Sequence, residues 1–145
     1  MAITSAICTS FKQELLVGTH NFTATTGNTF KIALFTSSAT LGAGTTAFAT
    51  TNEITNSSGT AYTSGGATLT SITPTTDSTT AVCDFNDVSF TDASFTANGA
   101  LIYNSSQSNK AVAVIAFGSD KTVTSGTFTI EFPAADATNA IIRLA

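Results

Sequence analysis

The side chains that could carry acid–base or metal chemistry are few in this chain of 145 residues, and they lie far apart. His20 is the one histidine in the sequence. An imidazole with no cysteine, glutamate or second histidine beside it in the sequence can assemble neither a zinc site nor a catalytic triad by itself. We therefore expect His20 to have a structural or surface role.

Asp84, Asp87 and Asp92 form the only acidic cluster of the sequence. Carboxylate oxygens are the ligands that Ca²⁺ prefers, but this run lacks the alternating aspartates, the turn glycine and the terminal glutamate of a calcium loop. We expect these side chains to be solvated loop carboxylates, so no metal site is predicted.

The three glutamates, Glu14, Glu53 and Glu131, are spread along the chain and could meet only in the fold. A glycosidase needs two facing carboxylates, and sugar rings usually stack on aromatic side chains, yet Trp is absent and only two Tyr are present. No nucleophile, base and orienting group can be named together. The sequence thus predicts a protein that is not an enzyme, with no catalytic residue and no cofactor.

The two cysteines, Cys8 and Cys83, match neither a CxxC motif nor a zinc-ligand spacing. We expect two separate, buried or half-buried thiols. A disulfide between them stays an open alternative, because sequence does not give the distance between their Cα atoms.

The charge of the chain argues against several classes of partner. The formal net charge is −4, and charged residues make up 10% of the chain, where about 25% is usual. The five Lys and Arg are scattered singly, so we expect no nucleic-acid binding. No apolar run approaches the roughly 18 residues of a membrane span, and the N-terminus does not resemble a signal peptide. We expect an aqueous, reducing compartment and no membrane partner.

Threonine supplies about a fifth of the chain, which favours strands over helices. In the segment 29–36, Phe30, Ile32 and Leu34 share one face, which predicts a strand buried on one side and partly covered on the other. The fold class expected over residues 1–145 is a single mainly β domain, an antiparallel β-sandwich or a jelly-roll-like barrel. Further strands are predicted at 67–73, 80–85, 99–104, 111–117, 127–132 and 140–144.

One short helix is expected near the N-terminus, in a helical segment spanning residues 5–18. Ser10 fits an N-cap with Gln13 three residues later, and Gly18 fits a stop. Phe11, Leu15 and Leu16 form its apolar stripe.

Residues 37–66 form a long loop rich in glycine, serine and threonine, and long loops often carry function. We expect this loop to be an arm that reaches a neighbouring protein. Tight turns are predicted at 104–109, 118–121 and 124–126.

Surface chemistry remains as a way for this chain to act. Its 11 phenylalanines include several outside the strong strands, and aromatic residues anchor many protein interfaces. A core position is the alternative for each single ring, and we expect at least one of them to lie at an interface. The candidate partner-binding residues are Phe11, Lys12, Leu15, Leu16, Phe22 and Phe48.

Several stretches together resemble a family of small structural proteins of tailed bacteriophages, common in phages of cyanobacteria and other aquatic bacteria. The resemblance runs over nearly the whole chain and implies a virion structural role, but it brings no catalytic or ligand motif. The stretches that carry it are Gly27-Asn28-Thr29-Phe30-Lys31-Ile32-Ala33-Leu34-Phe35-Thr36-Ser37, 65–69, 98–104, 110–114 and 132–135.

Within a virion, two roles compete. A capsid decoration (cement) protein would bind the major capsid protein lattice at the capsid surface as a homotrimer or homodimer, after synthesis in the host cytoplasm. A tail, neck or fibre component would bind a tail partner or a receptor. The sequence has no heptad, collagen-like or β-helical shaft, which favours decoration. A carbohydrate-binding module is a third alternative, and it needs an aromatic groove around Tyr62 or Tyr103.

Overall fold

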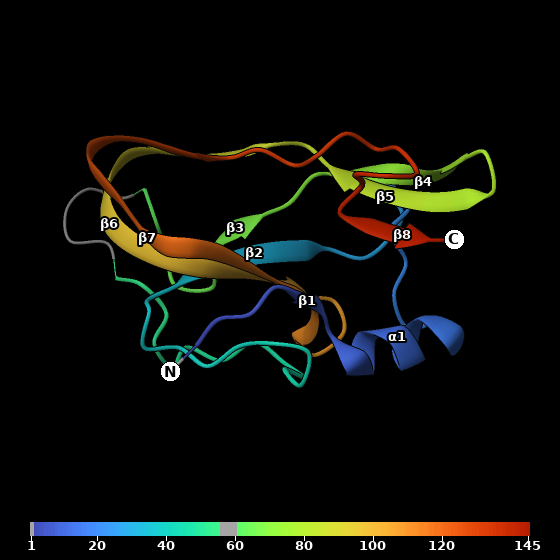
Figure 1. The fold of residues 1–145 in the computed structure, drawn as a ribbon, viewed down its shortest axis with the longest axis horizontal. Coiled ribbons are helices and arrows are strands. Elements are labelled where there is room, and N and C mark those ends of the chain that lie inside the picture. The colour runs from blue at the N-terminus through green and yellow to red at the C-terminus, as the bar shows by residue number, and fades with distance from the viewer. Residues whose placement is uncertain (1, 56–60) are drawn as a thin grey trace.

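The computed structural model describes residues 2–55 and 61–145 and is mainly β (Figure 1). Two antiparallel sheets of five and three strands pack around the core, with one short helix, and they are not closed into a barrel. The predicted antiparallel sandwich is therefore confirmed, and the jelly-roll-like barrel is wrong. The larger sheet has the order β1 (Ala6–Ile7), β7 (Lys110–Ile130), β6 (Val88–Asn104), β2 (Phe30–Phe35), β3 (Ala67–Thr68); the smaller has β4 (Ser71–Asp77), β5 (Thr80–Phe85), β8 (Ile142–Leu144).

A long hairpin of β6 and β7 contributes to both layers of the sandwich. The two strands pair from Asn104↔Lys110 to Val88↔Ile130, with register irregularities on the way. Such irregularities bend and twist a strand pair. Figure 1 shows the hairpin curling around one end of the molecule, so that its two halves lie in opposite layers.

The turns predicted at 118–121 and 124–126 are wrong, because β7 runs through both. Gly118 and Ser125 have positive φ angles of 81° and 46°. Positive φ angles are common in turns, but here pairing with β6 continues past both residues. The chain therefore bends there without reversing.

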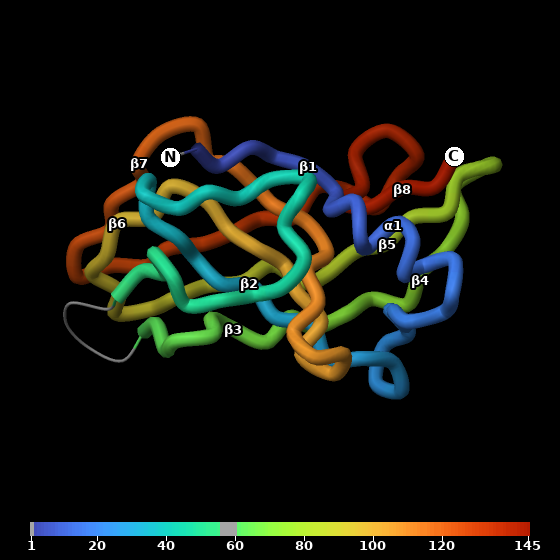
Figure 2. The backbone as a smooth tube through the Cα atoms, turned by 90° about the horizontal axis from the view of Figure 1, so that it is seen from below, coloured from blue at the N-terminus to red at the C-terminus, as the bar shows by residue number. Residues whose placement is uncertain are grey.

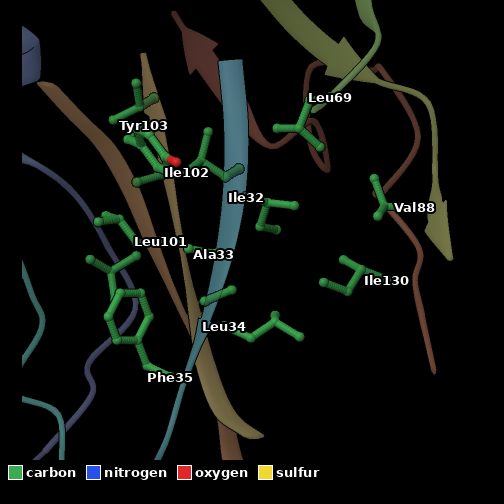
Figure 3. Packing of buried hydrophobic residues seen from close by; sticks show 14 of the residues in the cluster. Ile32, Ala33, Leu34, Phe35, Leu69, Val88, Leu101, Ile102, Tyr103 and Ile130 are labelled. Atoms are coloured by element: carbon green, nitrogen blue, oxygen red, sulfur yellow. The ribbon is translucent and has the colours of Figure 1, made fainter. Parts of the chain in front are cut away.

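Strand β2 lies at the centre of the molecule and is buried on both faces. Ile32 and Leu34 point toward Val88 and Ile130 across the interior, while Phe35 lies on the opposite face (Figure 3). The second face is covered more fully than expected, because Phe35 is 1% exposed, although Lys31 on the same face is half-buried.

That second face is covered by the long loop. Phe48 packs at 6.3 Å from the Phe35 ring and stacks on Tyr103 at 4.5 Å between ring centroids. The Phe48 N–H donates to the Asn109 carbonyl (2.9 Å), and Ala47 forms a bridge with Lys110. Residues 37–55 thus lie against their own domain, so the predicted arm is wrong for this part; residues 56–60 lie outside the described residues.

The helix α1 (Thr9–Leu16) is shorter than the expected segment 5–18, because Ala6 and Ile7 form strand β1 on β7 instead. Its N-cap is Cys8 without a side-chain hydrogen bond, and the Ser10 Oγ is buried with no hydrogen-bond partner, so the predicted Ser10 cap is wrong. The Gly18 stop is confirmed by a φ of 77°. Within the described residues, no helix is long and apolar enough to cross a membrane.

Candidate functional site: a protein-docking surface

Large apolar side chains are exposed at one end of the sandwich. Leu16 is 89% exposed, Val17 67% and Leu144 60%. The first two end helix α1 and the third belongs to β8; Figures 1 and 2 show these elements at the same end of the molecule, beside β5. Contiguous exposed apolar surface on a small domain is typical of an interaction site.

An apolar groove of about 440 Å³ lies between α1 and the smaller sheet. Leu15 lines it from the helix side, and Val82, Ile142 and Leu144 line it from β5 and β8. None of its lining residues is Asp, Glu, Lys or Arg. We refer to this groove together with Leu16, Val17 and Leu144 as the helix-end surface.

Helical geometry explains why Leu16 points away from the core. Successive side chains of an α-helix are rotated by about 100°, so residues three and four apart share a face. Phe11 and Glu14 are the buried residues of α1, and Leu15 is half-buried next to them. Leu16 and Val17 follow on the outward side, where nothing in the described part of the chain covers them.

A buried polar network fixes the helix to the β6–β7 turn. The His20 Nε2 lies 2.6 Å from Glu14 Oε2, and the Asn104 Nδ2 donates to His20 Nδ1 at 2.9 Å, which leaves the Nε2–H to donate to Glu14. Lys110 Nζ donates to Glu14 Oε1 at 3.1 Å. His20 is therefore held by hydrogen bonds at both ring nitrogens, in a structural position.

The environment of Glu14 favours its ionised form. Burial of the carboxyl raises its pKa, but the hydrogen bonds from His20 and Lys110 and the charge of Lys110 outweigh this, and the pKa lies below its usual value. Sequence analysis missed this partner of His20, because Glu14 is six residues earlier and reaches the imidazole only after α1 has ended and the chain has turned.

The predicted partner-binding residues divide into two groups. Phe11 is 0% exposed and Phe22 is 6% exposed, with the Phe22 ring stacked on Phe30 at 4.2 Å. Phe48 is half-buried against Tyr103. These three rings pack within the domain, so none of them is an exposed anchor, although Phe11 and Phe22 also line the groove of the helix-end surface.

Lys12, Leu15 and Leu16 are in the other group, whose side chains are exposed or half-buried on α1, and of these Leu15 and Leu16 belong to the helix-end surface. Lys12 is exposed on α1, Leu15 lines the groove, and Leu16 is the most exposed large apolar side chain among the described residues. Sequence analysis did not select Val17 or Leu144. The alternation of Ile142 and Leu144 indicates a strand but does not say that its second apolar side chain is left uncovered.

The tyrosines proposed for a sugar site are buried. Tyr62 is 6% exposed, and its hydroxyl donates to Glu53 Oε1 (2.7 Å) and accepts from the Leu34 N–H (2.9 Å). Tyr103 is 2% exposed and donates to the Gly65 carbonyl at 2.6 Å. Neither ring offers a face to a sugar, so the carbohydrate-binding alternative is wrong at these two residues.

The cysteines are free, as expected. Cys8 is buried, and Cys83 is half-buried in the wall of the groove. Burial raises the pKa of the Cys83 thiol to about 11. The thiol is therefore protonated at neutral pH, and the groove presents it as a small apolar group.

The carboxylates of the candidate acidic residues accept hydrogen bonds from different partners and do not gather at one site. Asp84 Oδ1 accepts from the Phe85 N–H, and Asp87 Oδ1 accepts from the Phe132 N–H, each at 2.8 Å. Glu53 binds Tyr62, and Glu14 binds His20, in two different networks. Among residues 2–55 and 61–145, no group of three or more His, Cys, Asp or Glu is placed to hold a metal ion.

The chain matches no protein-family model, no curated protein sequence and no solved structure. The helix-end surface is therefore the feature on which a function can be argued.

Proposed function

We propose that this chain is a structural protein of a tailed-phage virion, and that it acts as a capsid decoration protein by docking its helix-end surface onto the major capsid protein lattice. The observation that carries the proposal is the exposure of Leu16, Val17 and Leu144 at the same end of the molecule as an uncharged apolar groove, which Leu144 also lines. Buried centres of stable interfaces are depleted in charge in the same way. The resemblance of the sequence to structural proteins of tailed phages supports the kind of partner.

The free energy available at this surface is moderate. Full burial of a Leu or Val side chain contributes about 1.5–3 kcal/mol, whereas association costs at least about 4 kcal/mol in lost freedom of movement. Leu16, Val17 and Leu144 together can exceed this cost when the groove is also filled. A decoration protein then favours the intact shell, because it binds the assembled lattice and not its separated parts.

The shape of the domain supports attachment to a shell rather than projection from it. Helix α1 has eight residues, and the described strands form a two-layer sandwich with no shaft. A tail, neck or fibre component would use the same surface against a different partner. The position of this chain on the particle, at the shell or at the tail, therefore distinguishes the two roles.

The experiment is to mix the purified chain with capsids that lack it and to image the particles by electron cryo-microscopy. We expect ordered density at repeated positions of the capsid surface, with α1 and β8 facing the shell. Bare shells, together with density for this chain at the tail or neck of native virions, would contradict the decoration role. Density on the shell with α1 and β8 facing outward would contradict the docking surface alone.

A further inference from the structure

The second half of strand β7, residues 117–130, has no strand partner on its outer edge among the described residues. The first half is covered on that side: Ala113 and Val114 pair with β1, the Ala111 N–H donates to the Thr46 carbonyl, and the Val112 carbonyl accepts from the Cys8 N–H. Beyond Val114, the ladder of β7 within the described residues is the one with β6 on its inner side. An open strand edge of this length is a site where another chain can attach.

An apolar groove of about 490 Å³ is lined by residues of the bent β7 and by Phe132, Pro133 and Ile141 of the segment that follows it, and we refer to it as the β7 groove. Ile115 and Phe117 line it from one half of the bent strand, and Phe128 and Ile130 line it from the other. The Phe117 and Phe128 rings lie 6.0 Å apart. The bend of β7 thus leaves a gap in the side of the sandwich that is walled by half-buried aromatic and aliphatic side chains.

Two opposite charges, Lys121 and Glu131, also line the β7 groove, and both are exposed. In the described part of the chain the ion pairs are those of Glu14 with His20 and Lys110, so Lys121 and Glu131 do not pair with each other. Lys121 Nζ donates to Ser119 Oγ at 3.1 Å. A groove with one cation and one anion is electrostatically complementary to a second copy of itself.

We propose that the β7 groove is the interface through which two copies of this chain pair about a two-fold axis. A two-fold axis brings the same patch of both copies together, so a contact from residue i to residue j is always matched by one from j to i. Lys121 of each copy then faces Glu131 of the other, and the apolar walls of the two grooves cover each other. The β7 groove shares no lining residue with the groove of the helix-end surface, so pairing leaves that surface free.

The test is the mass of the full chain in solution, measured by sedimentation equilibrium over a range of concentrations at low salt. We expect twice the chain mass of 14.7 kDa for the unchanged protein. Lys121→Glu and Glu131→Lys should each weaken pairing at least tenfold, because each replaces two symmetric attractions by two repulsions. Both residues are exposed, so the unfolding midpoints of the variants should match that of the parent protein at concentrations low enough for the parent to be monomeric.

Two further samples distinguish pairing between copies from an indirect effect. An equimolar mixture of K121E and E131K should form mixed dimers, since each contact then joins opposite charges. The double variant K121E/E131K should recover the parent affinity. A monomer or trimer for the unchanged protein, or single variants and a mixture that all keep the parent mass, would overturn the proposal. These results would not contradict the capsid-docking proposal, because the capsid-binding experiment tests the helix-end surface and not the β7 groove.

Discussion

The central sheet buries its apolar side chains, whereas the helix end leaves large apolar side chains exposed to water. Around β2, both faces of the sheet are covered by the chain itself, and Phe35 and Leu101 are at most 1% exposed. At the helix end, Leu16 and Leu144 keep 89% and 60% of their surface in water. The same kind of side chain thus stabilises the fold in one region and remains available for binding in the other.

The largest effect is expected in the covered region. Phe30→Ala removes a fully buried ring that stacks on Phe22 at 4.2 Å and lies 5.9 Å from the ring of Phe85. Loss of apolar burial plus the remaining cavity should lower the free energy of unfolding by about 3–5 kcal/mol. Urea unfolding followed by circular dichroism measures this. A loss below about 1 kcal/mol would mean that Phe30 is not in the packed core.

An intermediate effect is expected where the helix joins the covered region. Glu14→Gln removes the charge that accepts hydrogen bonds from His20 and Lys110. Weakening these buried bonds should cost about 1–3 kcal/mol of unfolding free energy near neutral pH. Asp92→Asn is the matched control, since it removes an exposed carboxylate on β6.

The pH dependence sharpens this prediction. Because the pKa of Glu14 is lower in the folded chain than its ordinary value of 4.5, its stabilising contribution is complete above that value and is lost as the pH falls through the folded pKa. The parent protein should therefore lose more stability between pH 6 and pH 3 than Glu14→Gln does. Equal losses in the two proteins would contradict the ionised Glu14 described above.

The smallest effect on stability is expected at the open end. Leu16→Gln together with Val17→Gln replaces two exposed side chains without opening a cavity, and Gln is a good helix former. The free energy of unfolding should change by less than about 0.5 kcal/mol. A loss above about 1.5 kcal/mol, measured by urea unfolding, would show that these side chains support the fold, and the contrast between the two regions would disappear.

Local pattern predicted the covered region well. The alternation in 29–36 and 80–85 gave strands that the structure places at Phe30–Phe35 and Thr80–Phe85. The turns expected within β7 do not form, and the reason is tertiary pairing. Gly118 and Ser125 adopt the positive φ angles that are common in turns, but pairing with β6 on both sides of them keeps the strand continuous.

The helix-end surface was only partly predictable. Leu16 was selected because it extends the apolar stripe of the helix, whereas Phe11 and Phe22 were selected for their aromatic character and lie in the core. Whether a ring is buried depends on what packs over it, and Phe85, whose ring packs against Phe22, lies far from Phe22 along the chain. Leu144 becomes part of the surface only because β8 pairs with β5 at the edge of the smaller sheet.

The most direct test of the docking surface is the occupancy of capsids by Leu16→Asp, measured by co-sedimentation with shells that lack the protein. The matched control, Thr124→Asp, adds the same charge to an exposed position of β7 outside the helix-end surface. We predict that Thr124→Asp occupies the shells as the parent protein does, and that Leu16→Asp loses at least tenfold in affinity while remaining folded. Full occupancy by Leu16→Asp would contradict the assignment of the helix end as the surface that binds the capsid.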